Sequence, residues 1–180
     1  MKLLAVCVLV FSVMAQTRAA HEADDGSTDE EEVDLEEVDL EEVDLVQRSS
    51  CPPGWSPINN RCFRYVSKPM TWARAERHCL SMGANLASVH DRSEYRQVQS
   101  LIRRATRRCG RTWIGGSNAQ KTSVWLWSDG SPLRYTNWCH GEPNNWRNNQ
   151  HCLQMNYSGG KCWDDQTCSV CLPSVCAKKV

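Results

Sequence analysis

Glu142-Pro143-Asn144, followed further on by Trp163-Asp164-Asp165, is the pattern around which this sequence is organised, and both stretches lie among closely spaced cysteines. Proline stiffens the turn, and a cis peptide bond before it, which the sequence leaves open, would aim Glu142 and Asn144 the same way. The two stretches offer four oxygen-bearing side chains, and calcium takes about six to eight oxygen ligands, water included. The spacing fits a cation site and a polar turn beside an acidic loop equally well, so the rest of the chain has to decide.

The first residues of the chain predict secretion. Lys2 precedes an apolar run from Leu3 to Ala15, and small residues follow at Ala19 and Ala20, which is the pattern of a signal peptide over residues 1–20. The apolar run is shorter than the roughly 20 residues that a membrane-spanning helix requires, and no later stretch is long enough. We therefore expect a secreted, extracellular protein, whose 180 residues leave room for a short tail and one domain.

The formal net charge of zero conceals two parts of opposite charge. Residues 21–50 hold 14 Asp and Glu against one Arg, a net charge of −13, whereas residues 51–180 hold 18 Lys and Arg against 7 Asp and Glu, a net charge of +11. The acidic part repeats Glu-Glu-Val-Asp-Leu from Glu31, Glu36 and Glu41, at a spacing that fits neither a helix face nor a strand face. We interpret it either as a solvated spacer or as a propeptide that covers the basic domain until cleavage after Arg48.

Cysteine usage predicts a disulfide framework in residues 51–180. This part of the chain holds ten cysteines, and an eleventh, Cys7, lies in the predicted signal peptide. An even number in a secreted chain favours disulfides. Cys168 and Cys171 have the spacing of zinc and redox motifs, but an oxidising compartment favours structural bonds there too. The residues alone leave the connectivity open.

The hydrophobic patterns of residues 51–180 predict an α+β domain. One helix is expected after Thr71, ending near Gly83, and a second after Asp91, where Glu94 would complete a capping box. Alternating residues predict a strand around Cys62–Tyr65, and further short strands are expected in the later, tryptophan-rich part. These later strands are residues 113–116, 124–127, 153–157, 162–163 and 174–177.

The end of the second predicted helix is strongly basic. Favourable contact with the helix dipole accounts for one or two cations there, at about 0.3–1 kcal/mol each, but not for five. A patch of this density attracts sulfated glycans such as heparin, phospholipid headgroups or nucleic acid. No base-reading motif supports specific nucleic-acid binding. The arginines are Arg103, Arg104, Arg107, Arg108 and Arg111.

From Cys51 to Ala177 the sequence resembles a C-type lectin-like domain of the long form. The motifs that carry the resemblance are Cys51…Cys62, Trp72…Cys79, Trp113-Ile114-Gly115-Gly116, Trp125…Trp127-Ser128-Asp129-Gly130, Glu142-Pro143-Asn144, Cys152, Trp163-Asp164-Asp165, Cys168 and Cys176. Trp138-Cys139 and Gly160-Lys161-Cys162 make it most similar to the secreted fish group of ladderlectin-like lectins and type II antifreeze proteins. The resemblance implies two helices packed on short antiparallel β-sheets, a long calcium- and sugar-binding loop and several disulfides.

The resemblance also implies which cysteines are bonded. Two of them, Cys109 and Cys171, have no counterpart in the family pattern. We expect these two either to bond with each other or to link two chains in a homo-oligomer. The implied pairs are Cys51–Cys62, Cys79–Cys176, Cys152–Cys168 and, from the fish group, Cys139–Cys162.

By position, the resemblance implies a Ca2+ site and a sugar site built from the same side chains. In the family, calcium binds two sugar hydroxyls, and its protein ligands hydrogen-bond the same hydroxyls. The Glu-Pro-Asn order goes with mannose-type sugars in related lectins, and Gln-Pro-Asp goes with galactose. The implied calcium ligands are Glu142, Asn144, Gln150, Asp164 and Asp165, and the implied sugar contacts are Glu142, Asn144, Gln150, Asp164 and Trp146.

Two of these positions depart from the family pattern. Gln150 stands where Glu is usual, and Asp164 stands where Asn is usual. The site keeps three carboxylates, so calcium binding is expected to persist. An ionised Asp lacks the N–H that Asn would donate to a sugar hydroxyl, at a cost of about 1–3 kcal/mol. We therefore expect weakened or altered sugar selectivity.

Other residues near the loop allow two interpretations. Trp146 is either a sugar-stacking ring or a structural one, whereas Trp113, Trp125, Trp127 and Trp163 are expected in the core. Asn156-Tyr157-Ser158 is an N-glycosylation sequon close to the predicted site. His140 and His151 are interpreted as incidental neighbours rather than ligands.

Three functions remain open. The first is a calcium-dependent lectin that binds glycans on cell or microbial surfaces in innate defence, which chelator-sensitive sugar binding would reveal. The second is a basic anion-binding or antimicrobial protein released from its acidic segment, which salt-sensitive heparin binding would reveal. The third is an ice-binding antifreeze protein, which thermal hysteresis would reveal. No nucleophile, base and orienting group stand at a convincing spacing, so no enzymatic activity is expected.

Overall fold

The computed structural model describes residues 51–180. The predicted signal peptide, with Cys7, and the predicted acidic segment lie outside the described residues. None of the helices within 51–180 is long and apolar enough to cross a membrane. The elements are β1 (Ser56–Ile58), β2 (Arg61–Met70), α2 (Trp72–Leu80), β3 (Asn85–Leu86), α3 (Arg92–Thr106), β4 (Thr112–Ser117), β5 (Leu126–Trp127), the 3-10 helix η1 (Trp146–Asn148), β6 (Cys152–Tyr157), β7 (Cys162–Gln166) and β8 (Leu172–Lys179).

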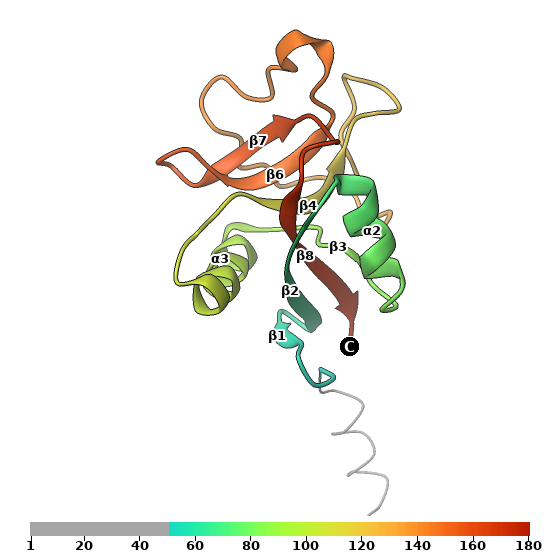
Figure 1. Ribbon diagram of the computed structural model, residues 1–180, viewed down its shortest axis with the longest axis vertical. Coiled ribbons are helices and arrows are strands. Elements are labelled where there is room, and N and C mark those ends of the chain that lie inside the picture. The colour runs from blue at the N-terminus through green and yellow to red at the C-terminus, as the bar shows by residue number, and fades with distance from the viewer. Residues whose placement is uncertain (1–50) are drawn as a thin grey trace, which may run out of the picture. The chain divides into compact units, whose positions relative to one another are not determined.

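One sheet runs through the whole domain in the order β1-β2-β8-β4-β6-β7, with β3 on β8 and β5 on β4. The pairs are antiparallel except β4 and β8, which run parallel where Trp113 meets Ser174. The sequence predicted only antiparallel pairs. The parallel pair arises because β8 is bonded to β2 along one edge and to β4 along its other edge. In Figure 1, α2 and α3 flank the β2–β8 pair, and β6, β7 and the long loop lie at the end remote from β1 and the C-terminus.

The two helices begin where the sequence predicts. The Asp91 side chain accepts a hydrogen bond of 2.8 Å from the Glu94 backbone N–H and so caps α3. The Glu94 carboxylate does not return the bond to Asp91, because it accepts from the His90 N–H at 2.8 Å and pairs with Arg61 at 2.7 Å. Half of the expected capping box is therefore replaced by a buried ion pair that ties α3 to β2.

The core forms where the two helices meet the sheet. The buried face of α3, with Val98 and Ile102, packs in one cluster with Leu153 and Trp163 of the sheet. The buried face of α2 packs in a second cluster that contains Trp113. As expected, Trp113, Trp127 and Trp163 are buried, whereas Trp125 is half-buried. Trp163 alone makes edge-to-face contacts with four aromatic rings: Tyr95, Trp127, Tyr135 and Trp138.

Four of the implied disulfides are present: Cys51–Cys62, Cys79–Cys176, Cys139–Cys162 and Cys152–Cys168. The expected Cys109–Cys171 bond is wrong, because both residues are free cysteines in the described part of the chain. Cys109 lies beside Tyr95 of α3, whereas Cys171 lies beside Thr71 at the start of α2. Since α2 and α3 lie on different sides of β2 and β8, packing keeps the two thiols apart.

Candidate calcium and sugar-binding site

The loop that carries the candidate site leaves Cys139 and returns to β6 at Cys152. Its base is held to β7 by a backbone hydrogen bond of 2.9 Å from the Cys139 N–H to the Trp163 carbonyl and by the Cys139–Cys162 disulfide. Gly141 has φ 84°, a value that glycine adopts readily, and the Glu142–Pro143 peptide bond is cis. The loop therefore turns sharply just where its first two predicted ligands stand.

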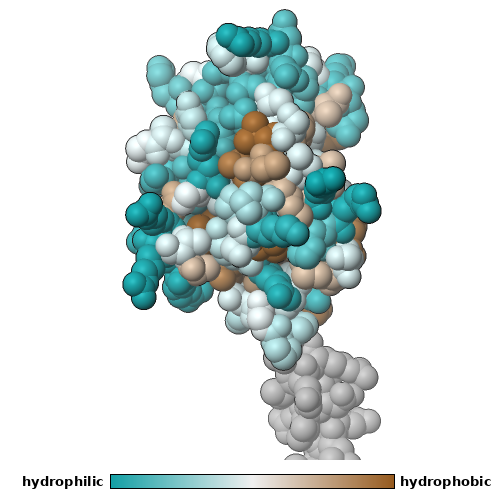
Figure 2. All heavy atoms as spheres, viewed as in Figure 1, coloured by the Kyte–Doolittle hydropathy of each residue, from teal (hydrophilic) through white to brown (hydrophobic). Residues whose placement is uncertain are grey.

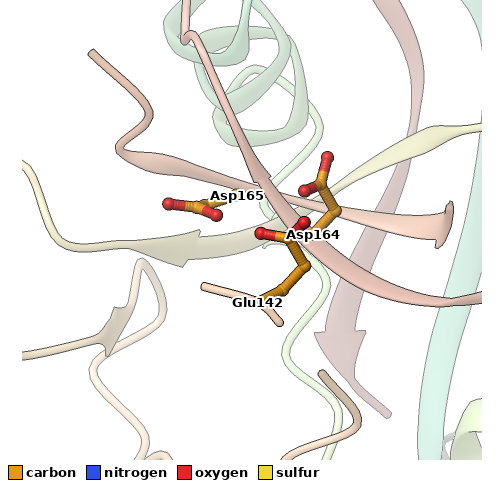
Figure 3. Close-up of side chains that lie close together, drawn as sticks. All are labelled: Glu142, Asp164 and Asp165. Carbon is orange, nitrogen blue, oxygen red and sulfur yellow. The ribbon is translucent and has the colours of Figure 1, made fainter. Parts of the chain in front are cut away.

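Three carboxylates meet between this loop and β7. Figure 3 shows Asp164 and Asp165 on the strand and Glu142 on the separate loop segment, and one oxygen of each lies within 4.8 Å of the others. Asp164 is 3% exposed and Asp165 is fully buried. Neighbouring residues of a strand point to opposite faces, yet both side chains reach the loop because β7 is the last strand of the sheet order.

Asp165 holds the loop against the strand. Its two carboxylate oxygens accept the backbone N–H groups of Asn144, at 3.0 Å, and of Asn145, at 2.7 Å. Glu142 accepts from the same Asn144 twice, from the backbone N–H at 3.1 Å and from the side-chain Nδ2 at 2.9 Å. These bonds place the Glu142 and Asn144 side chains together on one side of the cis proline.

Gln150 closes the predicted set from the far end of the loop. Its Oε1 accepts the Trp146 N–H at 2.7 Å, and Asn144 Oδ1 accepts the same N–H at 2.8 Å. The two amide oxygens therefore lie close together, and Gln150 is only 8% exposed. All five residues implied as ligands, Glu142, Asn144, Gln150, Asp164 and Asp165, are thus brought into one connected region.

The electrostatics of this region favour a bound cation. None of the Lys and Arg side chains within residues 51–180 forms an ion pair with the three carboxylates. Burial raises the pKa of Glu142 to about 7, and the neighbouring Asp164 and Asp165 add to the shift. Burial also raises the pKa of Asp164, although the hydrogen bond from Gln154 opposes that rise. The carboxylates repel one another, and a bound cation would relieve this repulsion. Carboxylate and amide oxygens are also the ligands that Ca2+ prefers.

Gln154 is a site residue that sequence reasoning missed. It lies opposite Asp164 in the β6–β7 pair, is fully buried and donates its side-chain Nε2 to Asp164 Oδ2. Its Oε1 has no hydrogen-bond partner among the described residues. Knowing which residue of β6 pairs with Asp164 would have identified Gln154. The sequence contains no feature that fixes this pairing.

The other predicted residues lie at the edge of the site or away from it. Trp146 is 61% exposed in η1, and the Arg147 guanidinium lies over its ring at 4.1 Å. His151 bonds to the Asn118 side chain at 3.0 Å and, like His140, is not part of the acidic cluster. The five basic residues at the end of α3 are all exposed and form no ion pair with the three carboxylates, although the positive charge of Arg111 opposes the rise in the pKa of Asp164.

Asn156, the candidate glycosylation residue of the sequon, is buried in the folded domain. Asn156 is 2% exposed, and its Nδ2, the atom that would carry the glycan, donates to the Gly110 carbonyl at 3.2 Å. Its Oδ1 accepts from Gln99 Nε2 at 2.9 Å. A glycan has no room at this atom in the folded domain.

Comparison with known proteins identifies the family. A family model described as the lectin C-type domain matches residues 68–178. Ladderlectin from Oncorhynchus mykiss is 42% identical over 127 residues, covering 71% of this chain and 67% of that protein. The galactose-specific lectin nattectin from Thalassophryne nattereri is 40% identical over 132 residues, covering 73% and 82%. The solved structure of herring type II antifreeze protein is 36% identical with a TM-score of 0.68, covering 72% of this chain and 99% of that one.

These comparisons confirm the predicted fold and the resemblance to the fish group. Proteins of this family bind carbohydrates rather than catalyse reactions, in agreement with the expectation that the chain is not an enzyme. Similarity alone does not separate lectins from antifreeze proteins, because both occur among the relatives. The family itself is established by the match over residues 68–178 and by the four disulfides, and the chain belongs to the C-type lectin domain family.

Proposed function

We propose that residues 51–180 form a secreted, calcium-dependent carbohydrate-binding domain with mannose-type selectivity and a role in innate defence. The observation that carries the proposal is the cluster of Glu142, Asp164 and Asp165, whose oxygens lie within 4.8 Å of one another and form no ion pair with a basic side chain of the described residues. Uncompensated carboxylates in a buried setting are costly unless a cation joins them. Glu142, Asn144, Gln150, Asp164 and Asp165 would hold that Ca2+.

Bound calcium would supply a positive centre to which two hydroxyls of a sugar attach. The chain's own side chains would then fix the sugar's orientation. Glu142 is an acceptor for hydroxyl protons, and Asn144 offers both an acceptor oxygen and an N–H donor. Asp165 keeps Asn144 in place through the backbone bonds described above. The exposed Trp146 ring, at the rim of the same loop, offers for stacking the face that Arg147 does not cover.

Sugar selectivity is proposed to rest on the Glu142-Pro143-Asn144 order. The relative nattectin is named galactose-specific, whereas the resemblance implies mannose-type sugars for this order. Asp164 offers no N–H when ionised, so one donor to the sugar is absent and single-site affinity should be weak. Strong binding to surfaces would then require several domains acting together.

Calorimetry on the full secreted chain tests the proposal. We expect saturable calcium binding, followed by binding of a methyl mannoside that a chelator abolishes and that a methyl galactoside does not reproduce. Asp165→Asn should lower calcium affinity at least about tenfold, because the substitution removes one of three ligand charges. Asp91→Asn makes the same chemical change at the start of α3, where Asn caps a helix as well as Asp, and should leave binding unchanged.

The possible outcomes separate the parts of the proposal. Mannoside binding that survives the chelator would overturn the calcium dependence. Calcium binding without any sugar would retain the metal site and reject the lectin function. The double variant Glu142→Gln/Asn144→Asp should prefer the galactoside over the mannoside. An unchanged preference would show that the Glu-Pro-Asn order does not select the sugar.

Ice binding is a second candidate. The herring type II antifreeze protein aligns with this chain over 99% of its own length. Thermal hysteresis measured on the same preparation, with calcium and with chelator, tests it directly. Hysteresis without sugar binding would favour this function over the lectin. Hysteresis that persists in Asp165→Asn would place the ice-binding surface away from the three carboxylates.

A further inference from the structure

The exposed face of α3 forms a basic groove that plays no part in the calcium site. Arg92, Arg96 and Arg103 recur at helical spacing along this face, and Lys161 faces them from the turn between β6 and β7. The groove has a volume of about 210 Å³ and continues at the end of α3 into the basic patch of residues 103–111. We call the surface formed by Arg92, Arg96, Arg103 and Lys161 the α3 basic groove.

The two walls of the groove are fixed to each other. The Tyr95 hydroxyl donates to the Lys161 carbonyl, and Gln99 Nε2 donates to the same carbonyl at 3.1 Å. The adjacent Cys162 is bonded to Cys139, which further restrains the turn. Because Tyr95 and Gln99 belong to α3, the helix itself holds Lys161 opposite the arginines. The backbone of the turn is therefore held beside α3, with the exposed Lys161 side chain in the same groove as the three arginines.

The positive charges of the groove are not neutralised within the domain. Arg61 is the one basic residue that forms ion pairs among residues 51–180, with Glu94 and Asp129. In Figure 2, several strongly hydrophilic residues lie, among paler and apolar ones, on the side of the molecule where α3 lies. The domain carries a net charge of +11, so the groove attracts anions over a longer range than any single arginine would.

We propose that the α3 basic groove binds the acidic segment of the same chain, residues 21–50. This segment has a net charge of −13 and presents its carboxylates in three closely spaced repeats. It joins the domain at Cys51, next to β1, and the neighbouring Asn59 side chain contacts Gln97 of α3 at 3.4 Å. The described chain therefore starts close to β1, a strand that contacts α3.

Chain length permits the contact. Thirty residues of extended chain span up to about 100 Å, whereas the 15 residues of α3 extend over about 22 Å. A tether of this kind gives an effective concentration on the order of millimolar, so weak charge contacts suffice. When bound, the acidic segment excludes other polyanions from the groove, and its removal by cleavage would open the groove to them.

Carbodiimide cross-linking, which joins a lysine amine directly to a contacting carboxylate, tests this proposal on the full chain. Intact mass first verifies that residues 21–50 are present. We expect Lys161 to become linked to carboxylates of residues 31–44 within one chain, both with calcium and with chelator. Lys68 is the internal control, because it lies with Arg74 and Arg77 in a different basic depression beside α2. About 0.5 M salt should abolish the Lys161 links, since the Debye length falls below about 5 Å.

Two matched variants separate docking in the groove from diffuse attraction. Arg92→Gln/Arg96→Gln/Arg103→Gln should lower the yield of Lys161 links about tenfold, because three surface charge contacts are lost. Arg74→Gln/Arg77→Gln should leave the yield unchanged. All five arginines are exposed, so both variants should fold, which an unchanged unfolding temperature verifies.

Several results would overturn the proposal. The proposal fails if Lys68 is linked as often as Lys161, or if no links form at all. It also fails if the links join two copies of the chain, or if the groove variant gives the same yield of Lys161 links as the unchanged protein. None of these results depends on calcium or sugar binding, so the proposal can fail while the lectin function stands, and the reverse also holds.

Discussion

At the scale of single residues, the site is a balance between repulsion and hydrogen bonding. Asp165 satisfies both of its oxygens with backbone N–H groups of the loop, whereas Glu142 receives its bonds only from Asn144. Burial, together with the two neighbouring aspartates, raises the pKa of Glu142 to about 7. The cation that the site is proposed to bind would remove this cost.

This pKa leads to a prediction about stability in calcium-free buffer. The Glu142 pKa rises from 4.5 in the unfolded chain to about 7 in the folded domain. Its contribution to stability is therefore fully present below about pH 4.5 and lost as the pH rises through about 7. The side chain of the Glu142→Gln variant is neutral at every pH. Near pH 8 the variant should therefore unfold at a higher temperature than the unchanged protein, and near pH 5 the two unfolding temperatures should be equal. A constant difference across this range would contradict the raised pKa.

Asn156 gives a second prediction at this scale. Because its side chain is buried and bonded to Gln99 and Gly110, the folded protein should carry no glycan there even when glycosylating cells secrete it. The chain contains a single sequon, so the intact mass before and after glycosidase treatment answers the question. A loss of mass on treatment would show that Asn156 is accessible.

At the scale of elements, the loop and β7 are joined by both covalent and hydrogen bonds. The Cys139–Cys162 disulfide lies beside backbone bonds of 2.9 Å and 2.7 Å, from Cys139 to Trp163 and from Trp163 to Asn137. These bonds also form the Trp138–Trp163 bridge. Either link could position the carboxylates, and the two can be separated by mutation.

Replacing both cysteines of this disulfide by serine should lower the free energy of unfolding by about 2–4 kcal/mol, because the unfolded chain regains its freedom. Calcium affinity should change little, since the backbone bonds still hold Glu142 near β7. Denaturant unfolding and calorimetry measure the two effects. The matched control replaces Cys51 and Cys62, which lie away from the loop. If only the Cys139–Cys162 variant loses calcium binding, the disulfide rather than the backbone positions the ligands.

At the scale of the whole molecule, the calcium loop and the core share Trp163. This residue packs against α3 and four aromatic rings, and the next two residues are the buried carboxylates. Ligand binding at Asp164 and Asp165 should therefore stabilise the fold as a whole.

Calcium at a hundred times its dissociation constant should stabilise the protein by about 2.7 kcal/mol. For a domain of this size, that gain corresponds to an increase in unfolding temperature of roughly 8–15 °C. Scanning calorimetry with and without calcium measures it. Asp165→Asn should lose most of the increase, and Asp91→Asn should keep it. An increase that Asp165→Asn retains would place the stabilising ion elsewhere.

Sequence alone determined the features that depend on local residues or on a family pattern. The Asp91 cap and the two amphipathic helices were predictable because short motifs specify them, and the four disulfides and the residues of the carboxylate cluster were predictable because the family pattern implies them. The predicted strand at residues 124–127 shortened to Leu126–Trp127, since pairing with β4 rather than propensity sets its length.

Tertiary structure decided whatever depends on which distant surfaces meet. It separated Cys109 from Cys171 through the two helices, buried Asn156 against α3 and placed Gln154 beneath Asp164. It also brought Lys161 onto the arginines of α3, which forms the basic groove. None of these contacts leaves a local trace in the sequence, because each depends on the packing of elements that are far apart along the chain.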